Sequence, residues 1–183
     1  TIEFEDEADS SRKHPEFIAV HKKSGERVAV EAKSKWRRGV IEWKVGTPAP
    51  EGFRLNLQDL LDDALGKSTE LPLIVFIDAN MPPDVARDAA GKWLPEMAAM
   101  LNDVTLKQVD PQSGSFSGVP FSTLVMTNFP HDYADPGSPD PGKICFMSAP
   151  RDPKRPLKHP EMLSAIELAL RQYGKVPQEF PVL

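Results

Sequence analysis

The sequence is poor in the features that mark several protein classes. Its only cysteine, Cys145, excludes an internal disulfide and a zinc site built from cysteines, and its place in KICFMS predicts a core residue. No apolar run approaches the roughly 18 residues of a membrane span, and the acidic start does not resemble a signal peptide. Walker loops, nucleophile elbows and GxGxxG motifs are also missing. We therefore expect a cytoplasmic protein that does not enter a membrane.

What is present is the composition of an ordinary globular domain. Of the 183 residues, 40% are hydrophobic and 27% are charged, so the chain can bury a core, and we expect residues 1–183 to form a single domain. The net charge of −5 does not favour nucleic acid as a partner. The charge is uneven, however, because residues 3–9 hold five acids and residues 33–38 hold four cations. The local distribution of charge is therefore a better guide to a binding partner than the net charge of the chain.

The apolar pattern predicts strands that alternate with helices. Residues 73–77 form an unbroken apolar run, which is typical of a strand covered on both faces. Residues 56–65 repeat apolar positions at helical spacing, with Asn56 as the N-cap and Gly66 as the stop. We expect an α/β domain with a mixed sheet flanked by helices. The other predicted elements are strands at 2–5, 121–128 and 143–148, a hairpin at 15–35, and helices at 160–174 and at 82–103, the latter split or kinked at Gly91 and Pro95.

The second half of the hairpin, VAVEAKSKWRR, changes from apolar to ionic within one strand. Alternate residues of a strand share a face, so Glu31 and Lys33 lie on the same side. A two- or four-residue turn centred on Ser24-Gly25 places Glu16 opposite Lys33, whereas a turn centred on Lys23-Ser24 places Glu16 opposite Glu31. In both registers the three charged residues share a face, and directly opposed Cβ atoms lie about 5 Å apart.

Charged side chains grouped in this way point to a metal and phosphate site. Two carboxylates this close repel each other and resist ionisation unless a cation joins them. Magnesium is a natural cation, because it prefers oxygen ligands and keeps positions for water and substrate phosphates. We expect Lys33 to hold or activate a water, or to meet charge that develops on a phosphate. The structural alternative is a cross-strand ion pair between Glu16 and Lys33.

Together these residues resemble the PD-(D/E)xK nuclease superfamily, which has the restriction-endonuclease-like fold. Pro15-Glu16 is similar to the proline–acid element, and Glu31-Ala32-Lys33 is similar to the second element, on consecutive hairpin strands. The helix, strand and helix that follow also look like that family's core. The resemblance covers residues from about 2 to 105, which makes residues 106–183 an elaboration of the nuclease-like domain.

The resemblance implies roles for individual residues. Glu16 and Glu31 would bind Mg²⁺ or Mn²⁺ with the backbone carbonyl of Ala32, and Lys33 would serve the attacking water. Gln58 looks similar to the glutamine that some members carry on the helix after the second element. Many members also have an acid on a helix before the hairpin. Here only the acidic opening is present, which leaves Glu3, Glu5 or Glu7 as the substitute.

Two basic segments each have two interpretations. The first, in KSKWRR, is either a DNA-binding surface or a solubilising exit from the strand. The second, RDPKRPLKH at residues 151–159, is either a similar surface or a solvated loop. The predicted DNA-binding residues are Lys35, Trp36, Arg37 and Arg38.

These patterns leave three hypotheses for the function. The first is a magnesium-dependent deoxyribonuclease that hydrolyses DNA phosphodiester bonds. Such an enzyme could act as a homodimer or within a larger multidomain assembly. The second is a catalytically inactive domain of the same fold that binds DNA or assembles with a protein. The third is an unrelated α/β enzyme that uses Asp78 and Asn80, at the strand end where open sheets often bind ligands. For those two residues a turn and helix-capping role is the alternative.

Overall fold

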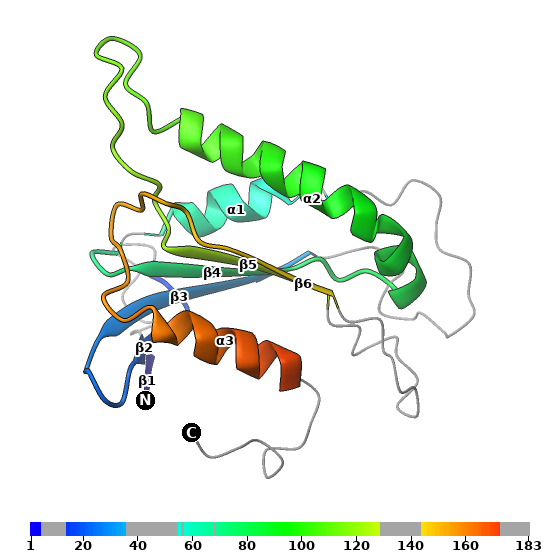
Figure 1. Ribbon diagram of the computed structural model, residues 1–183, viewed down its shortest axis with the longest axis horizontal. Helices are drawn as coiled ribbons and strands as arrows, with labels where there is room; N and C mark the ends of the chain where they lie inside the picture. Colours follow the sequence, from blue (N-terminus) through cyan, green and yellow to red (C-terminus); the bar gives the residue numbers. More distant parts are fainter. Residues whose placement is uncertain (5–13, 36–54, 56, 68, 129–143, 173–183) are drawn as a thin grey trace.

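The computed structural model describes residues 1–4, 14–35, 55, 57–67, 69–128 and 144–172, and these form an α/β domain. Within them, six strands form one mixed sheet. Figure 1 shows α1 (Gln58–Leu65) and α2 (Pro83–Leu106) on one face of the sheet and α3 (Glu161–Gln172) on the other. The predicted α/β class with a mixed sheet between helices is therefore confirmed. No helix in the described ranges combines the length and the apolar character that crossing a bilayer requires.

The strands lie in the sheet in chain order. They are β1 (Ile2–Phe4), β2 (Phe17–Val20), β3 (Arg27–Ser34), β4 (Leu73–Asp78), β5 (Thr123–Asn128) and β6 (Ile144–Ser148). The pairs β1–β2, β2–β3 and β5–β6 are antiparallel, whereas β3, β4 and β5 run parallel. The three parallel strands therefore end at the same edge, where Ser34 pairs with Asp78 and Asp78 pairs with Thr127.

Each face of the sheet has its own apolar core. Leu61 of α1 and Trp93 of α2 are buried in one core together with Val75 of β4. On the opposite face, Ile74 of β4 is buried and packs with Ile166 of α3. Neighbouring residues of β4 thus enter different cores, as the unbroken apolar run predicts. Full burial of a large apolar side chain contributes about 1.5–3 kcal/mol, so both helical layers stabilise the sheet.

Helix α2 is one continuous helix through Gly91 and Pro95, so of the predicted split or kink the split is wrong. Proline removes one hydrogen bond within a helix, and Pro95 does so on the exposed side of α2. Trp93 and Met97, on either side of Pro95, are buried against the sheet. Packing of this buried face holds together a helix that the backbone preference alone would interrupt.

Cys145 is exposed, so the prediction of a core cysteine is also wrong. It lies in β6, which pairs with β5 at one edge of the sheet. Successive residues of a strand point to opposite faces, and in β6 it is Phe146 that turns to the core, with its ring 5.5 Å from that of Trp93. Cys145 therefore projects from the opposite face.

Candidate functional site

The turn between β2 and β3 decides which charged residues meet. Ile18 pairs with Ala29, which is the register expected for a turn centred on Lys23-Ser24. Two residues further along each strand on the same face, this register places Glu16 beside Glu31. Of the two registers that the sequence allows, the structure thus has the one that joins the two predicted acids.

Glu16 reaches Glu31 through its backbone. The amide of Glu16 donates a hydrogen bond to Oε2 of Glu31, with the two atoms 3.2 Å apart. The side chain of Glu16 is exposed, whereas the side chain of Glu31 is 0% exposed. The two predicted acids are therefore adjacent, but in this structure only one of the two carboxylates is inside the protein.

Glu31 is the centre of a charged cluster that consists of Glu31, Lys33, Asp63 and Lys67. Oε1 of Glu31 lies 2.8 Å from Nζ of Lys33 and 3.5 Å from Nζ of Lys67. Nζ of Lys33 also lies 2.9 Å from Oδ2 of Asp63. The Lys33 ammonium is thus held between two carboxylates, one from the sheet and one from α1.

Strand β3 and the end of α1 each supply two members of the charged cluster. Glu31 and Lys33 alternate with Ala29 on the face of β3 that enters the α1 and α2 core. Leu61 of α1 is buried in the same core, which brings Asp63 to the edge of the helix nearest Lys33. Lys67 lies just beyond α1, after the C-cap Gly66, and its Nζ reaches Oε1 of Glu31.

The ends of α1 can be compared with the predicted N-cap and the predicted stop of this helix. Gly66 is the C-cap of α1, which confirms the predicted stop and allows Lys67 to turn back towards Glu31. The N-cap is Leu57, whose side chain makes no capping hydrogen bond. Asn56, the predicted N-cap, lies outside the described residues.

The electrostatics of the charged cluster keep Lys33 protonated. Burial of Lys33 opposes its charge, but hydrogen bonds and charge attraction from Glu31 and Asp63 outweigh that effect and raise the pKa of Lys33 above its ordinary 10.5. At neutral pH the side chain is therefore an ammonium ion. It can stabilise negative charge or orient a water molecule, but it is not available as a proton acceptor.

The donor set around Glu31 is compatible with a magnesium ion. The described residues contain no group of three or more His, Cys, Asp or Glu side chains placed to hold a metal. Magnesium needs fewer, because it is commonly bound by one or two carboxylates with waters and phosphate oxygens. Oε1 of Glu31 is buried, and it forms ion pairs with the ammonium groups of Lys33 and Lys67. Together with Glu16, Glu31 can therefore supply oxygens of the kind that Mg²⁺ or Mn²⁺ prefers.

Gln58 and Ala32 lie near the charged cluster but contact other groups. Nε2 of Gln58 donates a hydrogen bond to Oδ1 of Asp62 at 2.9 Å, so Gln58 is directed along the outside of α1. It also lines a pocket of about 340 Å³ between α1 and α2, together with Met97 and Met100. Ala32 lies between Glu31 and Lys33 in β3, in register with Phe76 of β4.

Of the predicted DNA-binding run, Lys35 alone falls within the described residues. Its amide donates to the carbonyl oxygen of Asp78 at 2.9 Å, and its carbonyl oxygen accepts from Nδ2 of Asn80 at 3.0 Å. Lys35 therefore extends the contact between β3 and the end of β4. Trp36, Arg37 and Arg38 lie outside the described residues.

Asp78 and Asn80 form the turn that follows β4. Oδ2 of Asp78 accepts a hydrogen bond from the amide of Asn80 at 3.1 Å, and Oδ1 accepts one from Oγ1 of Thr127 at 2.9 Å. Asn80 has a φ of 48°, a left-handed conformation that asparagine tolerates better than most residues. The predicted turn role is confirmed. The capping role is not, because the N-cap of α2 is Pro82 and no side chain caps it.

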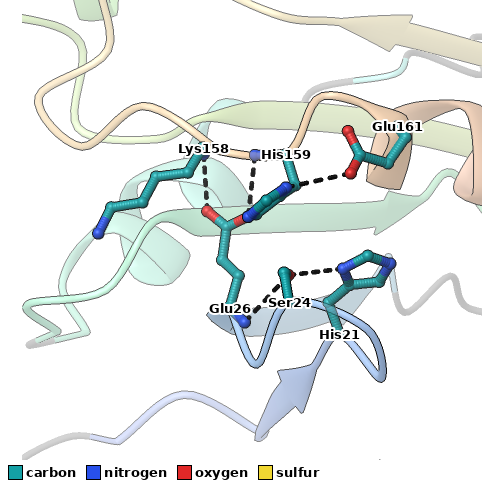
Figure 2. A network of polar contacts seen from close by, with 6 residues as sticks. All are labelled: His21, Ser24, Glu26, Lys158, His159 and Glu161. Carbon is teal, nitrogen blue, oxygen red and sulfur yellow. Dashed lines mark hydrogen bonds and ion pairs between the residues drawn. The ribbon is translucent and has the colours of Figure 1, made fainter.

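The second basic segment is attached to the hairpin turn at the opposite end of β3. Figure 2 shows the carboxylate of Glu26 accepting hydrogen bonds from the amides of Lys158 and His159, at 2.7 and 3.0 Å. The rings of His21 and His159 lie 5.8 Å apart, and Nδ1 of His159 is 3.1 Å from Oε1 of Glu161. These contacts anchor the backbone that leads into α3 to the hairpin turn, while the segment itself is irregular, with every residue exposed or partly exposed.

Two members of the charged cluster, Asp63 and Lys67, were not predicted as site residues. The sequence contains little signal for either residue, because Asp63 is one of three acids on α1 and Lys67 lies beyond its C-cap. Which side of that helix faces β3 becomes clear only from the packing. Comparison of the chain with protein-family models, with curated proteins and with solved structures found no match.

Proposed function

We propose that this protein is a metal-dependent nuclease that hydrolyses DNA phosphodiester bonds at the charged cluster. The observation that carries the proposal is the buried carboxylate of Glu31, which has Glu16 beside it across the hairpin and the Lys33 ammonium 2.8 Å away. An acid from each hairpin strand and a lysine two residues after the second acid are the features that the PD-(D/E)xK resemblance requires.

The energetics of the charged cluster support a functional role. Removing charges from water costs several kcal/mol per ion, and apolar residues of similar volume often stabilise a fold as well or better. Glu31 is nevertheless completely buried, beside side chains of Lys33 and Lys67 that are 18% and 17% exposed. Charged groups retained at such a cost are frequently found where chemistry takes place.

The position of the charged cluster in the sheet supports the same proposal. Glu31 and Lys33 lie in the last half of β3, close to the edge where the parallel strands end. Ligands of open α/β sheets commonly bind beyond that edge. The hairpin also leads through α1 into the parallel strand β4, which is the order of elements expected for a restriction-endonuclease-like domain.

In the proposed reaction Glu31 and Glu16 hold Mg²⁺ or Mn²⁺, with the backbone carbonyl of Ala32 as a further oxygen. When bound, such an ion would lower the pKa of a water and offset phosphate charge. Lys33 contributes a fixed positive charge that orients the attacking water or stabilises charge on the phosphate. Lys35 and the cations that follow it bind the DNA backbone.

A cleavage assay tests the proposal. Purified protein should degrade single- or double-stranded DNA with Mg²⁺ or Mn²⁺ and lose this activity with EDTA, in Glu31→Gln and in Lys33→Ala. Lys107→Ala is the matched control, since Lys107 pairs with Asp103 at 2.7 Å on the surface. Circular dichroism confirms that each variant is folded. Absence of cleavage by the wild type with both metals would refute the catalytic role.

One observation favours a second function, that of an inactive nuclease-like module. The carboxylate of Glu31 is occupied by two lysines and one amide, an arrangement that also serves to anchor α1 on the sheet. Such a module would bind DNA in a salt-dependent manner or bind a protein partner, with no loss in Lys33→Ala. A fluorescence-polarisation titration of the wild type and Lys33→Ala, beside the cleavage gel, distinguishes the two functions.

A further inference from the structure

We propose that Asp63 is a positioning residue that holds the Lys33 ammonium in place for the reaction. This inference rests on the proposed function, and it assigns a role to a residue outside the hairpin. It starts from the fact that Nζ of Lys33 lies 2.9 Å from Oδ2 of Asp63 and 2.8 Å from Oε1 of Glu31.

A lysine side chain needs more than one anchor to stay in one place. Its ammonium is a compact charge on a flexible four-carbon stem, and fixing such a stem costs up to about 2 kcal/mol in side-chain entropy. Glu31 is two residues away on the same strand and provides one anchor. Asp63 comes from α1 and approaches from the helical layer, so the two carboxylates confine the ammonium between the sheet and the helix.

The neighbouring acids of α1 do not share this role. Asp62 accepts a hydrogen bond from Gln58 and lies 3.7 Å from Nζ of Lys107, so it faces away from β3. Asp63 and Asp62 have nearly equal side-chain exposure, 46% and 47%. Two adjacent aspartates with equal exposure but different partners make a matched pair for mutation.

Asp63 provides Lys33 with a carboxylate partner that is not a metal ligand in the proposed reaction. When the carboxylate of Glu31 coordinates a cation, its attraction for the ammonium is shared. Asp63, which lies 2.9 Å from Nζ in this structure, would still hold the Lys33 ammonium in place.

Steady-state kinetics of DNA cleavage test the inference. Asp63→Asn should reduce kcat by about 10- to 100-fold, the loss typical of a misplaced catalytic group, with little change in KM. Asp63→Glu should restore most of the activity, because it returns a carboxylate to the same helical position. Asp62→Asn should behave as the wild type. Equal kcat values for Asp63→Asn and Asp62→Asn would overturn the inference.

A second measurement separates this inference from the proposed function. In ¹⁵N-lysine-labelled, metal-free protein, the side-chain ammonium signal of Lys33, identified by its loss in Lys33→Ala, should be slow to exchange with water. It should broaden or vanish in Asp63→Asn and persist in Asp62→Asn. If the wild type cleaves no DNA but this pattern holds, the nuclease proposal fails while the positioning of Lys33 stands. If the signal is unaffected in Asp63→Asn, Asp63 does not position Lys33.

Discussion

The amide of Glu16 lies 3.2 Å from Oε2 of Glu31, so the two hairpin strands are joined by a hydrogen bond to a carboxylate where their charged residues meet. A backbone donor is lost only on substitution by proline. Oε2 therefore keeps this donor in every other variant of Glu16, while Oε1 faces the lysines. One carboxylate oxygen of Glu31 thus makes a structural contact, and the other belongs to the charged cluster.

Removal of Lys33 should destabilise the protein, because it leaves a buried carboxylate with Lys67 as its remaining cation. Breaking a buried ion pair typically costs 3–5 kcal/mol, and we expect about 3 kcal/mol for Lys33→Met since Lys67 stays. The double variant Lys33→Met with Glu31→Met should lose less, because no charge is left buried. Urea unfolding measures both. A double variant less stable than the single one would contradict this expectation.

The stability of the metal-free protein should depend on alkaline pH through Lys33. The pKa of Lys33 is raised on folding, so its stabilising effect is complete below its unfolded value near 10.5 and is lost as the pH rises through the folded value. The free energy of unfolding should therefore fall above that unfolded value. In urea unfolding experiments across this pH range, the free energy of unfolding of Lys33→Met should fall less steeply than that of the wild type. Parallel curves would show that Lys33 gains no stabilisation from its carboxylates.

Replacement of Pro95 by alanine should stabilise the protein. Pro95 is exposed within the continuous helix α2, and proline costs about 3 kcal/mol relative to alanine in a helix interior. Because the chain around Pro95 is already adapted to it, we expect a gain of about 1–2 kcal/mol. Thermal unfolding measures the change. A lower midpoint for Pro95→Ala would mean that α2 depends on the proline.

Loss of the Glu26 carboxylate should loosen the segment that leads into α3. Glu26 accepts hydrogen bonds from two backbone amides, and bonds to a charged group contribute about 1.5–3 kcal/mol each. In Glu26→Gln the amides of Lys158 and His159 should exchange with solvent faster. Glu167→Gln is the control, since Glu167 pairs with Arg171 within α3 and, among the described residues, accepts no hydrogen bond from the segment's backbone. Unchanged exchange in Glu26→Gln would show that other contacts hold the segment.

The sequence contains most of the fold and part of the candidate site. Periodicity predicts the hairpin, α1, the buried strand β4 and the closing helix, because each of these elements follows a local apolar pattern. The hairpin register is left with two solutions, since both turn positions suit the sequence. The structure selects the one in which Ile18 pairs with Ala29.

The rest depends on packing between distant segments. Asp63 joins the charged cluster because α1 lies on β3 with Leu61 inward, and no local pattern fixes that rotation. The split predicted at Pro95 is wrong because buried contacts override the local helix preference. The buried position predicted for Cys145 is wrong because its strand forms the edge of the sheet. The basic run after β3 remains a prediction, with Lys35 as its one described member.

The site of divalent-ion binding is the most direct test of the proposed nuclease. In crystals soaked in Mn²⁺, anomalous density should appear roughly 2 Å from a carboxylate oxygen of Glu31, the coordination distance of small divalent ions, and should be lost in Glu31→Gln. Density beside Asp78, with none at Glu31, would contradict the placement of the metal in the charged cluster.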